Sequence, residues 1–215
     1  MIESPALRRS LRLLATASAL SVLGACAPVL FGGAMMGGAM VATDRRTSGT
    51  QLEDEGIELR SANRISERWG DKVHINITSY NRRVLLTGEA PDATTREQIE
   101  RLVGAVDNVK LIVNEIAILG NSTLTQRSSD TLVTGRVKAG LVDAKDLSAN
   151  AFKVVTERGI TYLMGRVTQR EADRATDVAR SIQGVQKVVR VFEIISDAEL
   201  RAIAPPTAPA STPVK

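Results

Sequence analysis

Cys26 is the only cysteine of this 215-residue chain, and its thiol is the most nucleophilic side chain that the sequence offers. It follows three arginines between positions 8 and 12 and then an uncharged run, rich in Leu and Ala, over 13–25. A positive start before an apolar run of this length is typical of an export signal, and the run is too short to span a bilayer. We therefore predict a signal peptide at 1–25. A single cysteine forms no disulfide within the chain.

The residues around this cysteine, Leu23-Gly24-Ala25-Cys26, resemble the bacterial lipobox, in which an aliphatic residue and two small residues precede the cysteine. The resemblance implies that the thiol of Cys26 receives a diacylglycerol, that the signal is cut before it, and that the new amino group is acylated, for example with palmitate. Several acyl chains on one residue anchor a protein stably, whereas a single chain is marginal. Ala27 follows the cysteine where Asp would favour the inner membrane, so the resemblance points to the outer membrane.

Two alternatives to a cleaved lipoprotein signal remain open. The cysteine could be a chance residue of a secretory signal, or the uncharged stretch to Thr43 could be an uncleaved membrane span. Pro28 and five glycines between positions 24 and 38 make that continuation a poor helix. We predict instead that residues 26–50 are the lipidated cysteine and a flexible tether, and that the Pro-rich residues 199–215 are disordered.

The body of the chain contains an internal repeat. The sequence VLLTGEA at 84–90 matches TYLMGRV at 161–167, which places Gly88 and Gly165 77 residues apart. Each glycine follows an apolar, strand-like run and precedes a polar, helix-favouring stretch, after which a β-branched run completes the repeat.

Each repeat is predicted to have the order helix–strand–strand–helix–strand. In the first repeat we expect helices at 57–69 and 92–104 and strands at 72–79, 84–88 and 108–118. In the second we expect helices at 130–142 and 169–182 and strands at 151–157, 160–165 and 186–195, with Asp130 as the N-cap of its helix. A right-handed strand–helix–strand crossover places two of the strands in parallel. The predicted fold class is α+β, in which each repeat packs a small mixed three-stranded sheet on two helices.

The order of elements, the strand–glycine signatures and the closing motifs AVDNV and GVQKV resemble the BON domain. Two BON domains behind a lipobox are similar to the family of dual BON-domain outer-membrane lipoproteins. On this basis we assign the domains to 51–120 and 130–198, with a linker at 121–129. The resemblance implies a non-enzymatic protein that faces the periplasm and supports envelope integrity. It also implies binding to anionic phospholipid, such as phosphatidylglycerol or cardiolipin, and contacts with proteins of cell division or outer-membrane assembly.

The resemblance assigns phospholipid binding to the first helix of the second domain, which is DTLVTGRVKAGL at 130–141. Three of its residues are spaced i, i+4, i+8 and are expected to face the core: Val133, Val137 and Leu141. The predicted phospholipid-binding residues are Leu132, Val133, Arg136 and Lys138. One exposed apolar side chain beside two cations suits a shallow contact with an anionic membrane. The alternative is an ordinary amphipathic helix with a solvated basic edge. In addition, the resemblance is not complete, because Leu132 stands where a member of that family has Trp.

The sequence contains no constellation of catalytic residues and no motif for a cofactor or metal. His74 is the only histidine, and it falls on the polar side of a predicted strand, where a surface position is expected. The absence of a dense Lys/Arg cluster and the small number of aromatic residues argue against nucleic acid. We therefore predict no enzyme activity, no cofactor, no metal site and no nucleic-acid partner.

The charge of the two halves differs in sign. Residues 51–118 carry 9 basic and 12 acidic side chains, a net charge of −3, whereas residues 130–204 carry 12 basic and 10 acidic ones, a net charge of +2. This difference in charge suggests that the two halves have different partners. Two rival functions thus remain: an interaction module whose protein partner docks on the acidic first domain around Glu97 and Glu100, and a chaperone-like periplasmic protein.

Overall fold

The computed structural model describes residues 44–203. The predicted signal peptide, Cys26 with the tether as far as residue 43, and the tail beyond residue 203 lie outside the described residues. Within residues 44–203, no helix has the length and apolar character needed to cross a membrane.

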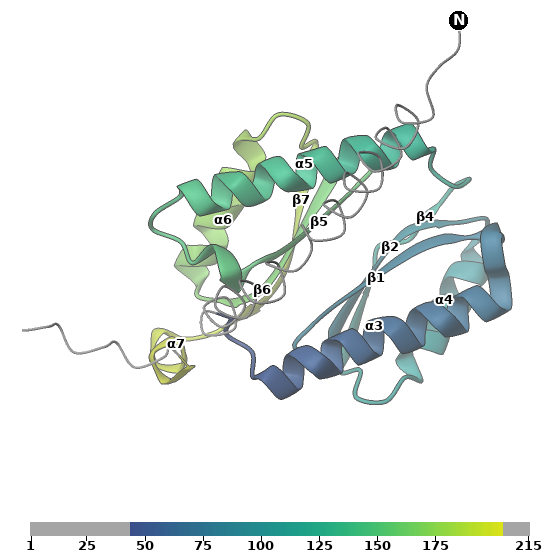
Figure 1. Cartoon of the computed structure of the whole chain (residues 1–215), viewed down its shortest axis with the longest axis horizontal. Coiled ribbons are helices and arrows are strands. Elements are labelled where there is room, and N and C mark those ends of the chain that lie inside the picture. Colours follow the sequence, from purple (N-terminus) through teal and green to yellow (C-terminus); the bar gives the residue numbers. More distant parts are fainter. Residues whose placement is uncertain (1–43, 204–215) are drawn as a thin grey trace, which may run out of the picture. The chain divides into compact units, whose positions relative to one another are not determined.

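The first repeat is a mixed sheet with two helices on one face (Figure 1). Its elements are α3 (Ser48–Trp69), the 3₁₀ turn η2 (Gly70–Lys72), β1 (His74–Tyr80), β2 (Arg83–Ala90), α4 (Ala93–Gly104), β3 (Leu111–Asn114) and β4 (Ala117–Ile118). Strand β1 pairs antiparallel with β2, and β2 pairs parallel with both β3 and β4. The third predicted strand is therefore split, and at the break the Asn114 side chain accepts a hydrogen bond from the backbone N–H of Ile116.

The second repeat has the same order of elements. It comprises α5 (Leu124–Asp143), the 3₁₀ turn η3 (Ala149–Ala151), β5 (Lys153–Glu157), β6 (Ile160–Val167), α6 (Gln169–Ser181) and β7 (Lys187–Ile194), and a short helix α7 (Asp197–Ile203) follows. Strand β6 pairs antiparallel with β5 and parallel with β7. Two mixed sheets, each covered by helices, confirm the predicted α+β fold class.

Three segments that were expected to be irregular are helical. Helix α3 begins at Ser48, inside the predicted tether, and α5 begins at Leu124, inside the predicted linker. Residues 199–203 of the predicted disordered tail belong to α7. The side chains of Thr47 and Thr123 cap α3 and α5, so Asp130 is not an N-cap. The added first turns are largely polar and exposed, and they give no apolar periodicity from which a helix could be predicted.

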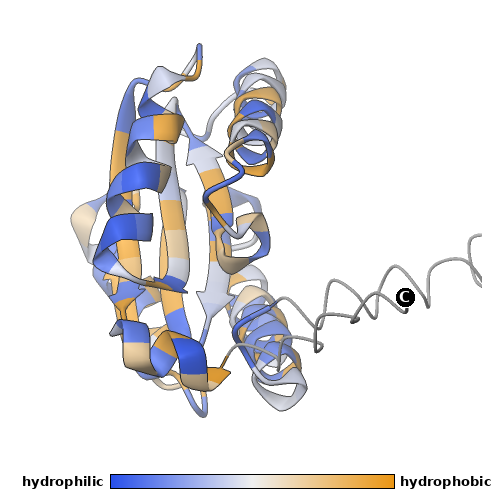
Figure 2. Ribbon diagram, turned by 90° about the vertical axis from the view of Figure 1, so that its left-hand side faces the viewer, coloured by the Kyte–Doolittle hydropathy of each residue, from blue (hydrophilic) through white to orange (hydrophobic). Residues whose placement is uncertain are grey.

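Strands β2 and β6 are buried on both faces. On one face, Val84 and Leu86 pack under the helices of the first repeat, as Leu163 and Val167 pack in the second. The other faces of the two sheets share a third cluster, made of Tyr80, Leu85, Tyr162, Met164 and Val191. In Figure 2 the hydrophobic colour accordingly runs along much of the strands. The two repeats therefore bury a common apolar surface in addition to their own cores.

The segment before α3 is held by two arginines. Arg45 forms a bidentate ion pair with Glu171 of α6, at 2.6 and 2.9 Å, and also donates to the carbonyl of Arg166 at 2.8 Å. Arg46 pairs with Asp54 of α3 at 2.8 Å and lies over the ring of Tyr80, 4.3 Å from its centroid. Arg45 therefore contacts the second repeat, and Arg46 contacts the first.

We expect Glu171→Gln to lower the free energy of unfolding at pH 7 by about 1.5–3 kcal/mol, the usual contribution of a hydrogen bond to a charged group. Burial alone raises the pKa of Glu171, but hydrogen bonds from Arg45 and Thr168 together outweigh it and hold this pKa below its ordinary range. The carboxylate therefore stabilises the fold fully above the pKa of the unfolded chain, and this contribution is lost as pH falls through the folded-state pKa.

Urea unfolding of the wild type and the variant at pH 7 and in acid measures this effect, and the difference between them should shrink in acid. The exposed Glu67 provides the control Glu67→Gln, which should leave stability unchanged. A wild-type advantage that is constant across the pH range would contradict the assignment.

Candidate functional site

The outward surface of α5 carries exposed apolar and basic side chains together. We call this surface the α5 face and define it by Leu124, Leu132, Arg136, Lys138 and Val142. The three apolar residues are 79%, 64% and 66% exposed, in chain order. Arg136 and Lys138 are also exposed, and Arg136 has one long contact of 3.5 Å, with the carbonyl of Gln183. Exposed apolar side chains that share a helix surface with cations can enter the boundary between headgroups and acyl chains of an anionic membrane.

Val133 does not belong to this surface. Its side chain is 5% exposed and packs in the core of the second repeat with Val137 and Leu141. Of the four predicted phospholipid-binding residues, the structure therefore places Leu132, Arg136 and Lys138 on the surface and Val133 in the interior. Leu124 and Val142 join the surface, and sequence reasoning missed them because the predicted helix began too late for the one and its periodicity was followed only to Leu141.

A buried carboxylate fixes α5 to the sheet beneath it. Asp130 accepts the backbone N–H groups of Arg158, at 2.7 Å, and Gly159, at 2.9 Å, in the turn between β5 and β6. Asp54 holds the turn between β1 and β2 in the same way, by accepting from the N–H groups of Asn81 and Arg82. Both helices are thereby attached to a hairpin, so the α5 face is presented on a rigid element.

A second cluster of polar groups surrounds His74. This side chain is only 17% exposed, so the expected surface position is wrong, and its Nδ1 lies 2.9 Å from the Glu89 carboxylate. Glu89 is fully buried and also accepts from the N–H and hydroxyl of Ser122, each at 3.1 Å, and from Arg158 at 3.4 Å. Burial raises the pKa of Glu89, but these hydrogen bonds together outweigh it and lower the pKa.

Glu157 from the second repeat faces this cluster. It accepts a hydrogen bond from the side-chain amide of Asn76 in β1, and burial raises its pKa. Asn76 and Glu157 line a groove of about 340 Å³, together with His74 of the first repeat and Asp130 of the second. Sequence reasoning missed this cluster because its members come from two repeats and meet only once the two sheets pack together.

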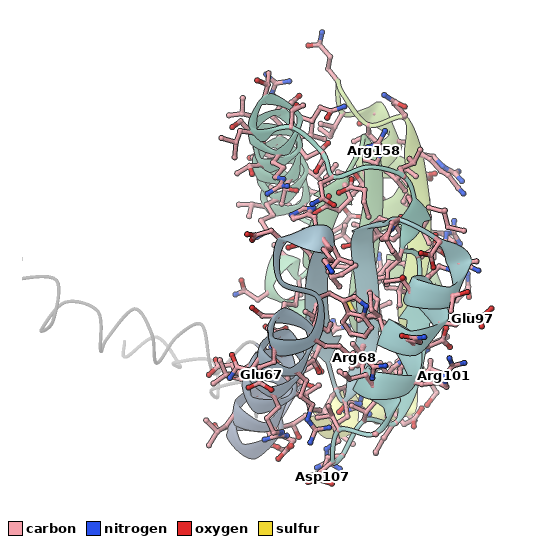
Figure 3. The ribbon with its side chains drawn as sticks, turned by 90° about the vertical axis from the view of Figure 1, so that its right-hand side faces the viewer. Glu67, Arg68, Glu97, Arg101, Asp107 and Arg158 are labelled. Carbon is pink, nitrogen blue, oxygen red and sulfur yellow. The ribbon has the colours of Figure 1, made fainter. Side chains whose placement is uncertain are left out.

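Glu97 and Glu100, the residues of the rival protein-docking hypothesis, lie on α4. Glu97 is paired loosely with Arg101, one helical turn away at 3.7 Å, and both project from α4 in Figure 3. Glu100 accepts a hydrogen bond from Asn114 at 2.8 Å and so is engaged within the fold. Docking of a protein partner on this surface stays a prediction.

The comparisons with known proteins agree with this fold. The BON-domain family model matches residues 53–120 and 129–196. The chain is 36% identical over 174 residues to the outer membrane lipoprotein DolP of Haemophilus influenzae, which covers 80% of this chain and 89% of that protein. It is 34% identical over 154 residues to the 21 kDa hemolysin of Actinobacillus pleuropneumoniae, with coverages of 71% and 79%.

Among solved structures, CdsD, a structural protein of the type III secretion system of Chlamydia trachomatis, aligns at 12% identity with a TM-score of 0.29, over 67% of this chain and 96% of that one. A similarity of this size carries no argument here. The family match and the two sequence relatives are sufficient by themselves: the chain belongs to the BON-domain family, as a dual BON protein of the DolP type.

Proposed function

We propose that this protein is an outer-membrane lipoprotein, anchored through Cys26 and facing the periplasm, whose α5 face contacts anionic phospholipid and so supports the envelope. Three observations support the proposal: the lipobox around Cys26, the name of the Haemophilus relative, and the composition of the α5 face. The proposal extends to action at cell-division sites, which only the family resemblance supports.

The α5 face carries the lipid-binding part of the proposal. Leu132 lies one helical turn before Arg136, and the exposed Lys138 follows two residues later. Each cation near an anionic surface contributes about 1 kcal/mol, and this contribution is screened by salt within a Debye length. Such a contact is weak and reversible, so the acyl chains on Cys26 provide most of the retention at the membrane and the α5 face provides the choice of lipid.

We expect Leu132→Glu combined with Arg136→Glu to abolish binding of the unlipidated chain, residues 26–215 with Cys26→Ser, to liposomes that contain phosphatidylglycerol or cardiolipin. The change removes an apolar contact and reverses the charge of the surface, while the core beneath it stays intact. Flotation with anionic and with neutral vesicles, at low and at high salt, measures the effect. Wild-type protein should float only with anionic vesicles at low salt.

The matched control is Leu59→Glu combined with Lys72→Glu in the first domain. Leu59 is 63% exposed, close to the 64% of Leu132, and both double variants change the net charge by the same amount. This control should bind like the wild type. Unchanged flotation of the α5 variant, or equal losses in both variants, would refute the assignment to α5.

A further inference from the structure

Three side chains of metal-ligating type meet where the two BON domains pack together, and two of them, His74 and Glu157, line the groove. His74 and Glu89 come from the first domain and Glu157 comes from the second, and their ligand atoms all lie within 4.8 Å of one another. A tetrahedral ion with bonds of about 2.0–2.1 Å separates its donors by roughly 3.4 Å, so small side-chain movements suffice to close the set. His74 Nδ1 and the Glu89 carboxylate, at 2.9 Å, are already near that separation.

The two carboxylates are positioned by hydrogen bonds from neighbouring residues. Ser122 donates to Glu89 through its N–H and its hydroxyl, and Asn76 donates to Glu157 through its side-chain amide. Supporting contacts of this kind orient the ligands of metal sites and are part of what distinguishes a site from a chance group of acids.

The charge of the groove is also suited to a cation. Among residues 44–203, no Lys or Arg nitrogen forms an ion pair with the Glu157 carboxylate, which shares the groove with Asp130. Arg158 contacts Glu89 from the solvent side, at 3.4 Å and with 35% of its side chain exposed. Arg127 also lines the groove, and its guanidinium is engaged with the hydroxyl and carbonyl of Ser122.

We propose that His74, Glu89 and Glu157 form a site for a divalent metal ion such as Zn²⁺. The bound ion would link the two BON domains. The ion takes the place of the direct contact between His74 Nδ1 and Glu89, and Glu157 completes three protein ligands. The fourth position is open to water through the groove. One imidazole with two carboxylates suits Zn²⁺ or Mn²⁺ and disfavours Ca²⁺ and Mg²⁺, which prefer oxygen ligands alone.

Zinc titration of the chain by calorimetry at pH 7.5, with thermal unfolding in parallel, tests this site. The protein is residues 26–215 with Cys26→Ser and no affinity tag, because a free thiol or a tag would bind zinc. We expect one equivalent of Zn²⁺ to bind and the melting temperature to rise, since an ion that binds only the folded chain stabilises it by mass action. Millimolar Ca²⁺ or Mg²⁺ should not displace it.

Three variants separate a built site from adventitious binding. Glu157→Gln and His74→Gln should each weaken Zn²⁺ binding by about tenfold or more, which is at least the loss seen when supporting contacts alone are removed. Glu97→Gln should have no effect, because Glu97 lies on α4, well apart from Arg158, which contacts the proposed ligand Glu89 (Figure 3). Arg158→Asn should tighten binding, since it removes the competing cation while Asn tolerates the positive φ of 53° at this turn.

The outcomes decide between the alternatives. Zinc binding that is lost in both ligand variants and kept in Glu97→Gln establishes the site. Absence of any zinc-dependent heat or thermal shift overturns it, and so does binding that survives both ligand substitutions. Flotation of the α5 variant is independent of these measurements, so the proposed lipid contact stands or falls separately.

Discussion

Asp54→Ala is expected to lower the free energy of unfolding by about 3–5 kcal/mol, the cost of leaving a buried charge and buried donors without their partner. Asp54 is 1% exposed and accepts four hydrogen bonds of 2.7–2.8 Å, from the Ser79 hydroxyl, the N–H groups of Asn81 and Arg82, and the Arg46 guanidinium. Asn81 and Arg82 have positive φ angles of 52° and 63°, a conformation that non-glycine residues rarely adopt. Loss of the carboxylate therefore releases a strained turn as well as an ion pair.

Urea unfolding followed by the fluorescence of Trp69, the only tryptophan, measures this change in the first domain. Asp130→Ala in the second domain should cost less, because Asp130 accepts from two backbone N–H groups and forms no ion pair within the described residues. The exposed Asp177 provides the control Asp177→Ala, which should change stability by less than about 0.5 kcal/mol. A loss below about 1 kcal/mol for Asp54→Ala would show that the turn does not depend on this carboxylate.

Gly88→Ala is expected to destabilise the protein by about 3–5 kcal/mol, through backbone strain together with steric overlap. Gly88 has a φ of +105°, and a Cβ at this position would lie 2.0 Å from the backbone carbonyl oxygen of His74 on the neighbouring strand. That oxygen belongs to a paired β-strand, so it cannot move away without breaking the pairing of β1 with β2. The equivalent Gly165 has the same constraint, because its Cβ would lie 2.3 Å from the carbonyl oxygen of Ala151.

Gly135→Ala is the matched control for this prediction. Gly135 lies in the interior of α5, and a Cβ added there would meet no neighbouring atom within 4 Å, so we expect the substitution to stabilise the protein by about 0.5–1 kcal/mol. Thermal and urea unfolding of the two variants should therefore shift in opposite directions. Equal shifts would mean that the close approach at Gly88 relaxes at little cost.

The elements and their apolar faces were predictable because their periodicity is local. The alternation along β1 and the repeated strand–glycine signature were enough to place both sheets, and the α+β class is confirmed. The runs around Leu85 and Tyr162 are apolar on consecutive positions, which is a sign of strands buried on both faces. Neither run shows which part of the protein packs on the second face of its strand, because that face packs on the other repeat.

The candidate sites also contain some residues that local sequence spacing could place and others that only the packing of the two repeats brings together. Leu132 and Lys138 were placed by helical spacing, and the structure exposes both, whereas Val133 shows the limit of choosing neighbours in sequence as neighbours on a surface. The cluster of His74 with Glu157 depends on two residues 83 positions apart in the numbering, and no local signal joins them. Helix α5 was predicted too short because its first two turns are stabilised by a cap at Thr123 rather than by an apolar stripe.

The adjacent arginines that precede α3 determine how mechanical load enters the folded part of the chain. Seventeen residues separate Cys26 from Asp44, a length that spans at most about 60 Å when fully drawn out. In the proposed lipoprotein, a pull on Cys26 would enter the folded part of the chain beside Arg45 and Arg46, which are attached to α6 and α3, respectively. Such a pull would therefore act on both domains at once.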